Sequence, residues 1–145
     1  MDDPLALEEQ VCFALAVASR SVVASYRAVL EPLGLTHPQY LAMLALWQHG
    51  PLSVKALGER LHLEPATVSP LVKRLEQADL VTRTRSSSDE RSIEVALTPG
   101  GKALRRKALK VPPEMLARFG MSVDDLHATN AVLHRIIAAA QAVPA

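Results

Sequence analysis

The side chain best suited to chemistry in this sequence is the thiol of Cys12, the single cysteine of the chain. A lone cysteine excludes a disulfide within the chain, and its commonest role is that of a small buried hydrophobic side chain. The residues after it repeat by threes and fours, the spacing of one seam along a helix: Leu15, Ser19, Val22, Tyr26 and Val29. The thiol is therefore expected on a patterned helical face, where it could either pack or react.

A second group of candidate residues combines short hydroxyl and basic side chains, which suit contacts to DNA. A helix that follows a short turn can enter the major groove, about 12 Å wide, with its N-terminal residues leading. In the helix expected after the turn HLEP, Thr67 and Ser69 can bond to phosphates or base edges. Lys73, seven residues after Ala66 and on the same side, could hold a phosphate together with Arg74. The alternative is a solvated helix face.

Arginines mark the hairpin that is expected next. Arg83 and Arg85 alternate on one face of the first predicted strand, and Arg91 projects from the polar connection SSSDERS. An arginine on a narrow tip suits insertion into the minor groove, where A·T-rich tracts concentrate negative potential. Asp89 could pair with Arg91, or with an arginine at the base of the strand, and so fix the shape of the loop. An ordinary charged loop is the alternative.

Net charge gives no support for DNA binding by itself. The chain of 145 residues has a formal charge of +1, and residues 53–98 hold seven Lys and Arg against seven Asp and Glu. The case for DNA therefore rests on where the charges sit. We expect no cofactor and no metal site, because the sequence has neither a Gly-rich phosphate loop nor Cys and His at metal-ligand spacing.

The hydrophobic share is high for a soluble monomer, at 49% with only 3% aromatic residues and a mean hydropathy of +0.13. This amount of apolar surface predicts burial against another chain. No uninterrupted apolar run reaches the roughly 18 residues of a membrane span, and the acidic start MDDPLALEEQ is unlike a signal peptide. We therefore expect a cytoplasmic protein with no membrane partner.

Caps, breaks and apolar repeats predict a series of helices and one hairpin. The helices are expected at 5–30, from the Thr36 cap to about 48, from the Ser53 cap to 61, at 65–79, from Thr98 with an interruption near Pro112–Pro113, and from the Ser122 cap to about 142. The strands are expected at 80–85 and 93–97, where apolar and polar residues alternate. Helix, turn, helix and hairpin in this order predict an α+β fold, mainly α, with a winged helix-turn-helix.

Three stretches resemble the MarR family of bacterial repressors: LTHPQYLAMLALW, SVKALGERLHLEPATVSPLVKRLEQADLVTR and RSSSDERSIEVALTPGGKAL. The run VCFALAVASR resembles the OhrR branch, which senses organic hydroperoxides. The resemblance covers about residues 9–110. It implies a single MarR-type domain, 1–145, whose lobe 36–98 reads DNA and whose long terminal helices, 5–35 and 105–145, join two copies into a homodimer.

The same resemblance assigns roles to individual residues. The homodimer would read a palindromic double-stranded operator, with Arg91 at the minor-groove position and four residues of the recognition helix facing the major groove: Ala66, Thr67, Ser69 and Pro70. Cys12 falls at the position of the branch's sensor thiol, which a peroxide oxidises to a sulfenic acid. Tyr26 matches one of two tyrosines that hydrogen-bond the thiolate. His37 stands where the other is expected, so this chain departs from the pattern.

The geometry of the sensor can be worked out from the sequence. Cys12 and Tyr26 are 14 residues apart, about 21 Å along a helix at 1.5 Å per residue. They cannot touch within one straight helix, but they could meet if the same helix of a second subunit crosses antiparallel, which two-fold symmetry allows. His37, if protonated, would stabilise a thiolate more strongly than a phenol does; the alternative is an exposed residue that merely follows the Thr36 cap. Tyr40 is a weaker candidate, because its i, i+3, i+4, i+7 spacing with Met43, Leu44 and Trp47 predicts a core face. Without a second cysteine, oxidised Cys12 would react with a low-molecular-weight thiol or proceed to the irreversible acids.

The leading hypothesis is a repressor that releases DNA when Cys12 is oxidised. The second keeps DNA binding but gives control to a small lipophilic or phenolic ligand in an inter-domain cleft, with Cys12 structural. The third is a winged helix used only for contacts with proteins. A peroxide-consuming enzyme is disfavoured, because no second thiol is present to close a catalytic cycle.

Overall fold

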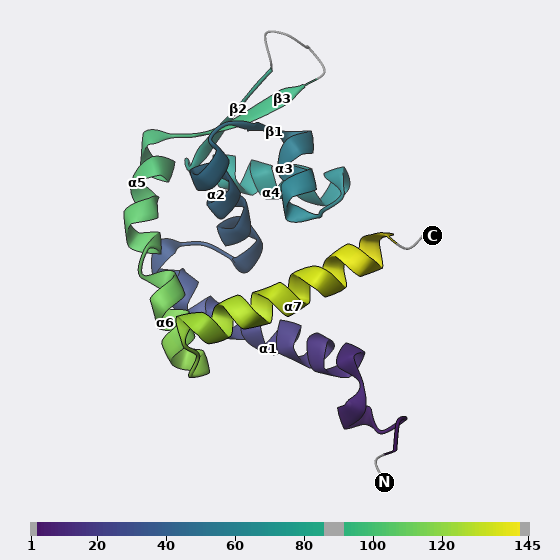
Figure 1. The fold of residues 1–145 in the computed structure, drawn as a ribbon. Helices are drawn as coiled ribbons and strands as arrows, with labels where there is room; N and C mark the ends of the chain where they lie inside the picture. Colours follow the sequence, from purple (N-terminus) through teal and green to yellow (C-terminus); the bar gives the residue numbers. More distant parts are fainter. Residues whose placement is uncertain (1–2, 86–91, 143–145) are drawn as a thin grey trace. The chain divides into compact units, whose positions relative to one another are not determined.

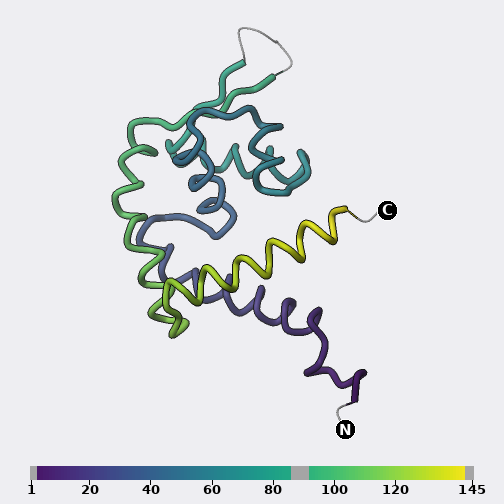
Figure 2. Tube along the Cα trace, viewed as in Figure 1, coloured from purple at the N-terminus to yellow at the C-terminus, as the bar shows by residue number. Residues whose placement is uncertain are grey.

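The computed structural model describes residues 3–85 and 92–142, so Asp89 and Arg91 lie outside the described residues. The chain divides into two compact units, Met1–Leu109 and Lys110–Ala145, which are described in turn. In the trace of Figure 2, the first unit passes from its long N-terminal helix through three shorter helices into a hairpin and then another helix.

Helix α1 spans Val11–Leu30, between the 3-10 turns η1, Leu7–Glu9, and η2, Glu31–Leu33. The prediction of one helix over 5–30 is confirmed from Val11 onward and wrong before it. Gln10 is extended, with φ −91° and ψ 125°, and its side-chain amide donates to the carbonyls of Pro4 and Ala6, each at 2.8 Å. These bonds satisfy local backbone acceptors outside a continuous helix.

Helix α2 spans His37–His49 and begins as predicted at a capping box. The Thr36 hydroxyl accepts from the Gln39 backbone N–H at 3.3 Å, and the Gln39 side chain accepts from the Thr36 N–H at 2.9 Å. The core face predicted for this helix, formed by Tyr40, Met43, Leu44 and Trp47, is only partly right. Tyr40 and Met43 are buried, but Leu44 is 38% exposed and Leu46 is fully buried in its place.

Helices α3, Val54–Leu61, and α4, Pro65–Gln77, form the helix-turn-helix. The predicted cap of α3 is confirmed, because the Ser53 hydroxyl accepts from the Ala56 N–H at 2.9 Å. Gly58 lets the turn close tightly, since a Cβ there would lie 3.0 Å from the Leu63 carbonyl oxygen and 3.1 Å from a Val68 methyl. Tight closure brings the start of α4 against α3.

Three antiparallel strands make a small sheet in the order β1-β3-β2. The strands β2, Val81–Arg85, and β3, Ile93–Leu97, confirm the predicted hairpin, which extends from the lobe in Figure 1. Sequence reasoning did not find β1, Leu52–Ser53, which pairs Leu52 with Val95. Val95 is fully buried, whereas Ile93 is 39% exposed, so the apolar alternation predicts burial only near the lobe.

The corner between α4 and the hairpin is closed by α5, Pro99–Ala108. Thr98 caps this helix as predicted and also donates from its hydroxyl to the Asp79 carbonyl at 2.6 Å. Gly101 is buried, and a Cβ there would overlap the carbonyl oxygen of Leu80. The Gly101 carbonyl accepts from the Trp47 indole N–H at 2.9 Å, so α2, α5 and the corner are joined at one point.

The second unit contains α6, Val111–Phe119, and α7, Val123–Ala142. The break predicted near Pro112–Pro113 lies just before these two prolines, between α5 and α6. The prolines themselves belong to the first turn of α6, where proline is tolerated. The predicted cap of α7 is confirmed by reciprocal bonds between Ser122 and Asp125, at 2.9 and 3.0 Å. No residue of α7 is buried, although the helix carries exposed Val132 and Ile137.

The N-terminal helix corrects one expectation. The segment Val11–Leu33 is long and apolar enough to cross a membrane by length and composition, with a mean hydropathy of 1.3 and 11% of the most apolar window buried. The expectation that no run was long enough counted only uninterrupted apolar residues. Alanine and valine keep the average high on either side of Arg20 and Arg27. Core helices of soluble proteins meet the same criterion, so this is weak evidence for a membrane.

Candidate nucleic-acid interface and thiol site

The predicted recognition helix α4 is divided sharply into two faces. Its buried face packs Val68, Leu71, Val72 and Leu75 into the lobe, all at 5% exposure or less. Its other face carries the residues predicted to contact DNA, and all of them are exposed: Ala66, Thr67, Ser69, Pro70, Lys73 and Arg74. The helix therefore presents small, hydroxyl and basic side chains together on one solvent-facing surface.

Pro65 and Pro70 have different effects in this helix. Pro65 lies in the first turn, where its missing N–H costs nothing. Pro70 lies inside the helix and cannot donate to the Ala66 carbonyl one turn earlier. Both residues of that missing bond are on the exposed face, so water can satisfy the carbonyl.

The two predicted strand arginines are exposed, and one of them has a defined partner. Arg83 donates from Nε and Nη2 to the same carboxylate oxygen of Glu76, at 3.3 and 3.0 Å. The Arg83 guanidinium holds the pKa of the Glu76 carboxyl below its usual value. Arg85 follows on the same face of β2 and makes interactions of its own. Asp89 and Arg91, the remaining predicted contacts, lie outside the described residues.

Two of the three predicted thiol-site residues meet within one chain. The ring of Tyr26 in α1 lies 5.2 Å from the ring of His37, at the start of α2. Cys12 is exposed near the beginning of α1, a separation from Tyr26 of about 21 Å along the helix. The structure therefore brings Tyr26 and His37 together and leaves Cys12 apart from them in the same chain.

A third ring, that of Tyr40, which the sequence offered only as a weaker candidate, joins this cluster. Tyr40 was expected in the core, and it is buried, with 4% exposure. Its ring also lies 5.8 Å from the ring of Tyr26. The signal was its position three residues after His37, which puts both side chains on one face of α2. Tyr40 therefore supports the outer pair from the core side.

Burial sets the protonation of all three rings. It raises the pKa of Tyr26, and together with the nearby Tyr26 it raises the pKa of Tyr40 to about 12. Burial lowers the pKa of His37, so its imidazole is mainly neutral near pH 7. The site thus offers phenol O–H and imidazole N–H donors to an incoming anion rather than a full positive charge at His37.

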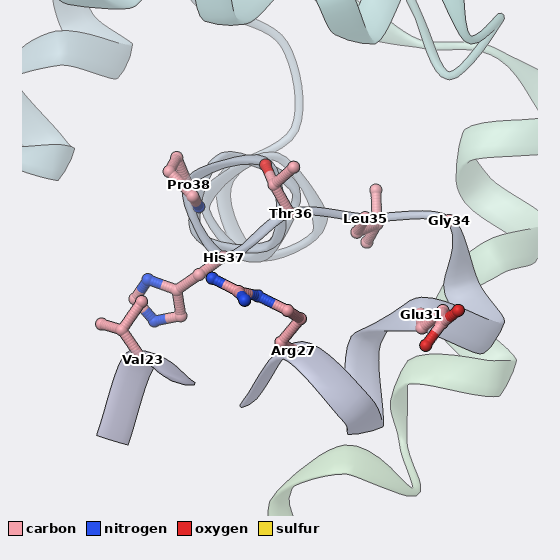
Figure 3. Close-up of a pocket in the computed structure, with 8 residues that line it drawn as sticks. All are labelled: Val23, Arg27, Glu31, Gly34, Leu35, Thr36, His37 and Pro38. Atoms are coloured by element: carbon pink, nitrogen blue, oxygen red, sulfur yellow. The ribbon is translucent and has the colours of Figure 1, made fainter. Parts of the chain in front are cut away.

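A cavity of about 490 Å³ opens beside His37. It is lined entirely by the end of α1 and the segment that leads into α2 (Figure 3): Val23, Arg27, Glu31, Gly34, Leu35, Thr36, His37 and Pro38. Arg27 and Glu31 are four residues apart, yet they point in different directions in Figure 3, and no ion pair joins them. The cavity has the size of a small organic ligand.

A smaller cavity of about 250 Å³ lies within the helix-turn-helix lobe. Apolar side chains of α2, α3 and α4 form most of it, and Thr67 and Arg74 reach it from the recognition helix. Among residues 3–85 and 92–142, no group of three or more His, Cys, Asp or Glu side chains could hold a metal ion.

Comparisons with known proteins agree with this architecture. Residues 35–93 match the model of the MarR family. The organic hydroperoxide resistance transcriptional regulator of Bacillus subtilis (strain 168) is 42% identical over 135 residues, which cover 93% of this chain and 92% of that protein. The structure of reduced AbfR bound to DNA superposes with a TM-score of 0.75 at 30% identity, over 90% of this chain and 91% of that one. The repressor CouR bound to a 23-mer DNA duplex gives a TM-score of 0.83 at 26% identity, over 94% and 99%. The winged helix-turn-helix lobe and these similarities together show that the chain belongs to the MarR family.

Proposed function

We propose that the protein is a homodimeric repressor that binds a palindromic DNA operator and releases it when an organic hydroperoxide oxidises Cys12. The observation that carries the DNA-binding half is the two-faced recognition helix, whose exposed side collects Thr67, Ser69 and Lys73. The sensing half is supported by the contact between the rings of Tyr26 and His37, whose centroids are 5.2 Å apart, since the sequence predicts both residues as thiolate partners. Such a repressor acts in the cytoplasm and is not an enzyme.

The DNA interface is assembled from the helix and the hairpin. The small residues Ala66 and Thr67 let the start of α4 approach base edges in the major groove, while Lys73 and Arg74 reach phosphates farther along. The minor-groove contact predicted for Arg91 and the supporting role predicted for Asp89 concern residues outside the described part of the chain. The similarity to AbfR and CouR, both solved with DNA, supports this arrangement.

The terminal segments 5–35 and 105–145 form the dimer interface. Their helices leave large apolar side chains exposed in the single chain, at Val11, Phe13 and Val17 in α1 and at Val132 and Ile137 in α7. Burying apolar area stabilises association by about 25 cal/mol per Å². A second copy of the chain covers this surface better than lipid does, because the exposed Arg20 and Arg27 also lie on α1.

The antiparallel crossing of two copies of α1 solves the distance problem at the sensor. Cys12 of one subunit then lies beside Tyr26 and His37 of the other, and each contact occurs twice. The phenol O–H and imidazole N–H donors stabilise the thiolate by hydrogen bonding. This arrangement also accounts for the exposure of Cys12 in a single chain.

Oxidation follows the ordinary chemistry of a thiolate and a hydroperoxide. The Cys12 sulfur attacks the terminal peroxide oxygen, an S–O bond forms as the O–O bond breaks, and the leaving alkoxide takes up a proton to give an alcohol. Sulfur loses two electrons and the peroxide gains them. A low-molecular-weight thiol then attacks the sulfenic acid to give a mixed disulfide and water, because the chain has no second cysteine.

Oxidised Cys12 no longer accepts hydrogen bonds from Tyr26 and His37 as a thiolate does. The two long helices shift, and the two recognition helices lose their common register. Half-sites must be about 34 Å apart, one turn of DNA, so a small rotation of the frame is enough to reduce binding.

A gel-shift experiment with the DNA upstream of the protein's own gene tests this function. Reduced wild-type protein is expected to bind, and cumene hydroperoxide is expected to release it while the mass of the Cys12 peptide rises by one oxygen or one thiol adduct. Cys12→Ser protein should bind and stay bound. Release of the Cys12→Ser protein by the same peroxide would refute the sensing mechanism and leave DNA binding intact.

The cavity beside His37 favours a second candidate, control by a small lipophilic ligand with Cys12 structural. Its apolar walls and about 490 Å³ suit a phenolic compound. In this case a phenolic acid such as salicylate releases both wild-type and Cys12→Ser protein from DNA. A Val23→Trp variant, which fills the cavity, should then resist the ligand while still binding the operator.

A further inference from the structure

We infer that Glu76 and Arg83 form a positioning pair that fixes the hairpin relative to the recognition helix, and that Arg83 contributes to DNA binding through this pair rather than by holding a phosphate. The inference deepens the proposed function and rests on its DNA-binding half. It makes Glu76, an acidic residue beside the DNA-reading surface, necessary for tight binding.

The register of the sheet determines where Arg83 points. Side chains alternate across a strand, so Arg83 shares a face of β2 with Val81. Val81 pairs with Leu97 and Arg83 pairs with Val95 in the neighbouring strand. Val81 and Val95 are both buried, at 1% and 0% exposure, so this face of the sheet is turned toward the lobe. The aliphatic part of Arg83 therefore starts on the inner face, and only its guanidinium reaches outward.

Glu76 lies where that guanidinium ends. It occupies the last turn of α4, which finishes at Gln77, and one of its carboxylate oxygens accepts both Arg83 bonds. Both side chains are about one-third exposed, at 32% for Arg83 and 38% for Glu76. Two charge-assisted bonds from one guanidinium restrict its orientation more than a single bond would.

The pair adds a restraint to a corner that is also held on its other side. Asp79 adopts a left-handed backbone with φ 59°, and its carbonyl accepts from the Thr98 hydroxyl at 2.6 Å. These features fix where the chain leaves α4 and where β3 ends. The Glu76–Arg83 pair acts farther out, at the middle of β2, and so restrains the tilt of the hairpin.

Loss of the Glu76 carboxylate is expected to weaken DNA binding, the opposite of the usual effect. Removing an acidic residue near DNA normally strengthens binding, because it reduces repulsion of the phosphates. Here Glu76→Gln should weaken operator binding by about two- to fivefold, the range expected from losing a partly exposed ion pair. Arg83→Gln should weaken it by a similar factor, and the double variant should be no weaker than either single one.

Salt dependence separates a positioning residue from a phosphate contact. We expect Arg83→Gln to leave the slope of log Kd against log salt unchanged, whereas Lys73→Gln, a variant of a proposed phosphate contact, should reduce it by about 0.9. Glu59→Gln is the matched control for loss of an acidic side chain in the same lobe, and it should bind at least as tightly as wild type. Fluorescence anisotropy with a labelled operator measures these five variants and the wild type.

A measurement on the free protein keeps the inference testable without DNA. Hydrogen exchange of the β2 backbone amides should be faster in Glu76→Gln than in wild type and Glu59→Gln, because the hairpin loses its restraint. Tighter operator binding by Glu76→Gln, or a slope reduced by about 0.9 in Arg83→Gln, would overturn the inference. So would unchanged exchange in Glu76→Gln. If wild type fails to bind its operator, DNA binding as proposed is wrong, and the exchange result still decides whether the pair holds the hairpin.

Discussion

Replacing Gly101 by alanine should destabilise the protein even though alanine is the better helix former. Gly101 lies in the first turn of α5, and its carbonyl accepts from Trp47 at 2.9 Å. A Cβ at this position would overlap the Leu80 carbonyl oxygen, which also accepts from the Thr98 backbone N–H at 3.0 Å. Relief of the overlap requires a backbone shift, since the opposing atom is not the end of a flexible side chain.

The magnitude follows from three contributions. Overpacking in a well-packed site costs about 1–3 kcal/mol. Weakening the Trp47 bond costs about 0.5–1.5 kcal/mol. The helical preference of alanine over glycine offsets up to about 1 kcal/mol. The net expectation for Gly101→Ala is a loss of about 1–3 kcal/mol in the free energy of unfolding.

The neighbouring glycine is a matched control. A Cβ on Gly100 would meet its nearest atoms, the Asp79 carbonyl oxygen and the Thr98 hydroxyl, at an ordinary 3.7 Å. Gly100→Ala should therefore stabilise the protein by about 0.4–1 kcal/mol, through the unfolded chain. Urea unfolding followed by circular dichroism at one fixed chain concentration measures both variants, because the stability of a dimer depends on concentration. Equal or stabilising effects of the two substitutions would refute the steric reasoning.

The remaining predictions concern the core and the ring cluster. Leu46→Ala should lower the free energy of unfolding by about 2–5 kcal/mol in the same assay, because Leu46 is fully buried and its truncation leaves a cavity in the core. Thr36→Ala should cost about 1 kcal/mol through loss of the α2 cap, whereas exposed Thr82→Ala should have a smaller effect. The lowered pKa of His37 means that the unfolded chain takes up the proton first, so stability should be complete above pH 6.5 and decline as the pH falls through and below that value. A His37→Gln variant should lack this part of the decline in unfolding curves measured between pH 7 and 5, roughly the histidine range. Absorbance titration at alkaline pH should show one tyrosine ionising near 12, and this step should be missing in Tyr40→Phe.

Local chemistry accounts for the parts of the fold that could be predicted. Thr36, Ser53, Thr98 and Ser122 each begin a helix where the sequence indicated, because a hydroxyl that caps free backbone N–H groups acts over three residues and needs no tertiary information. The strand β1 was missed for the opposite reason. It is only two residues long and exists because Leu52 pairs with Val95, which is distant in the sequence.

The core of α2 shows why a single apolar face is an incomplete guide. This helix contacts α1, α3, α4 and α5, so side chains all around it are partly covered. Leu46 is therefore buried and Leu44 is exposed, although of these two residues only Leu44 fits the i, i+3, i+4, i+7 repeat that predicts the core face. At the thiol site, the sequence favours Tyr26 and His37 and makes Tyr40 only a weaker candidate, because the contact of Tyr40 with Tyr26 depends on how two helices cross.

The bond between Trp47 and the Gly101 carbonyl gives this protein an intrinsic optical probe. The chain has a single tryptophan, so its emission comes from one defined place, where α2 meets the beginning of α5. Loss of the indole hydrogen bond or entry of water at that place changes the wavelength and intensity of the emission. A change of environment where α2 meets α5 can thus be followed in real time on unlabelled protein.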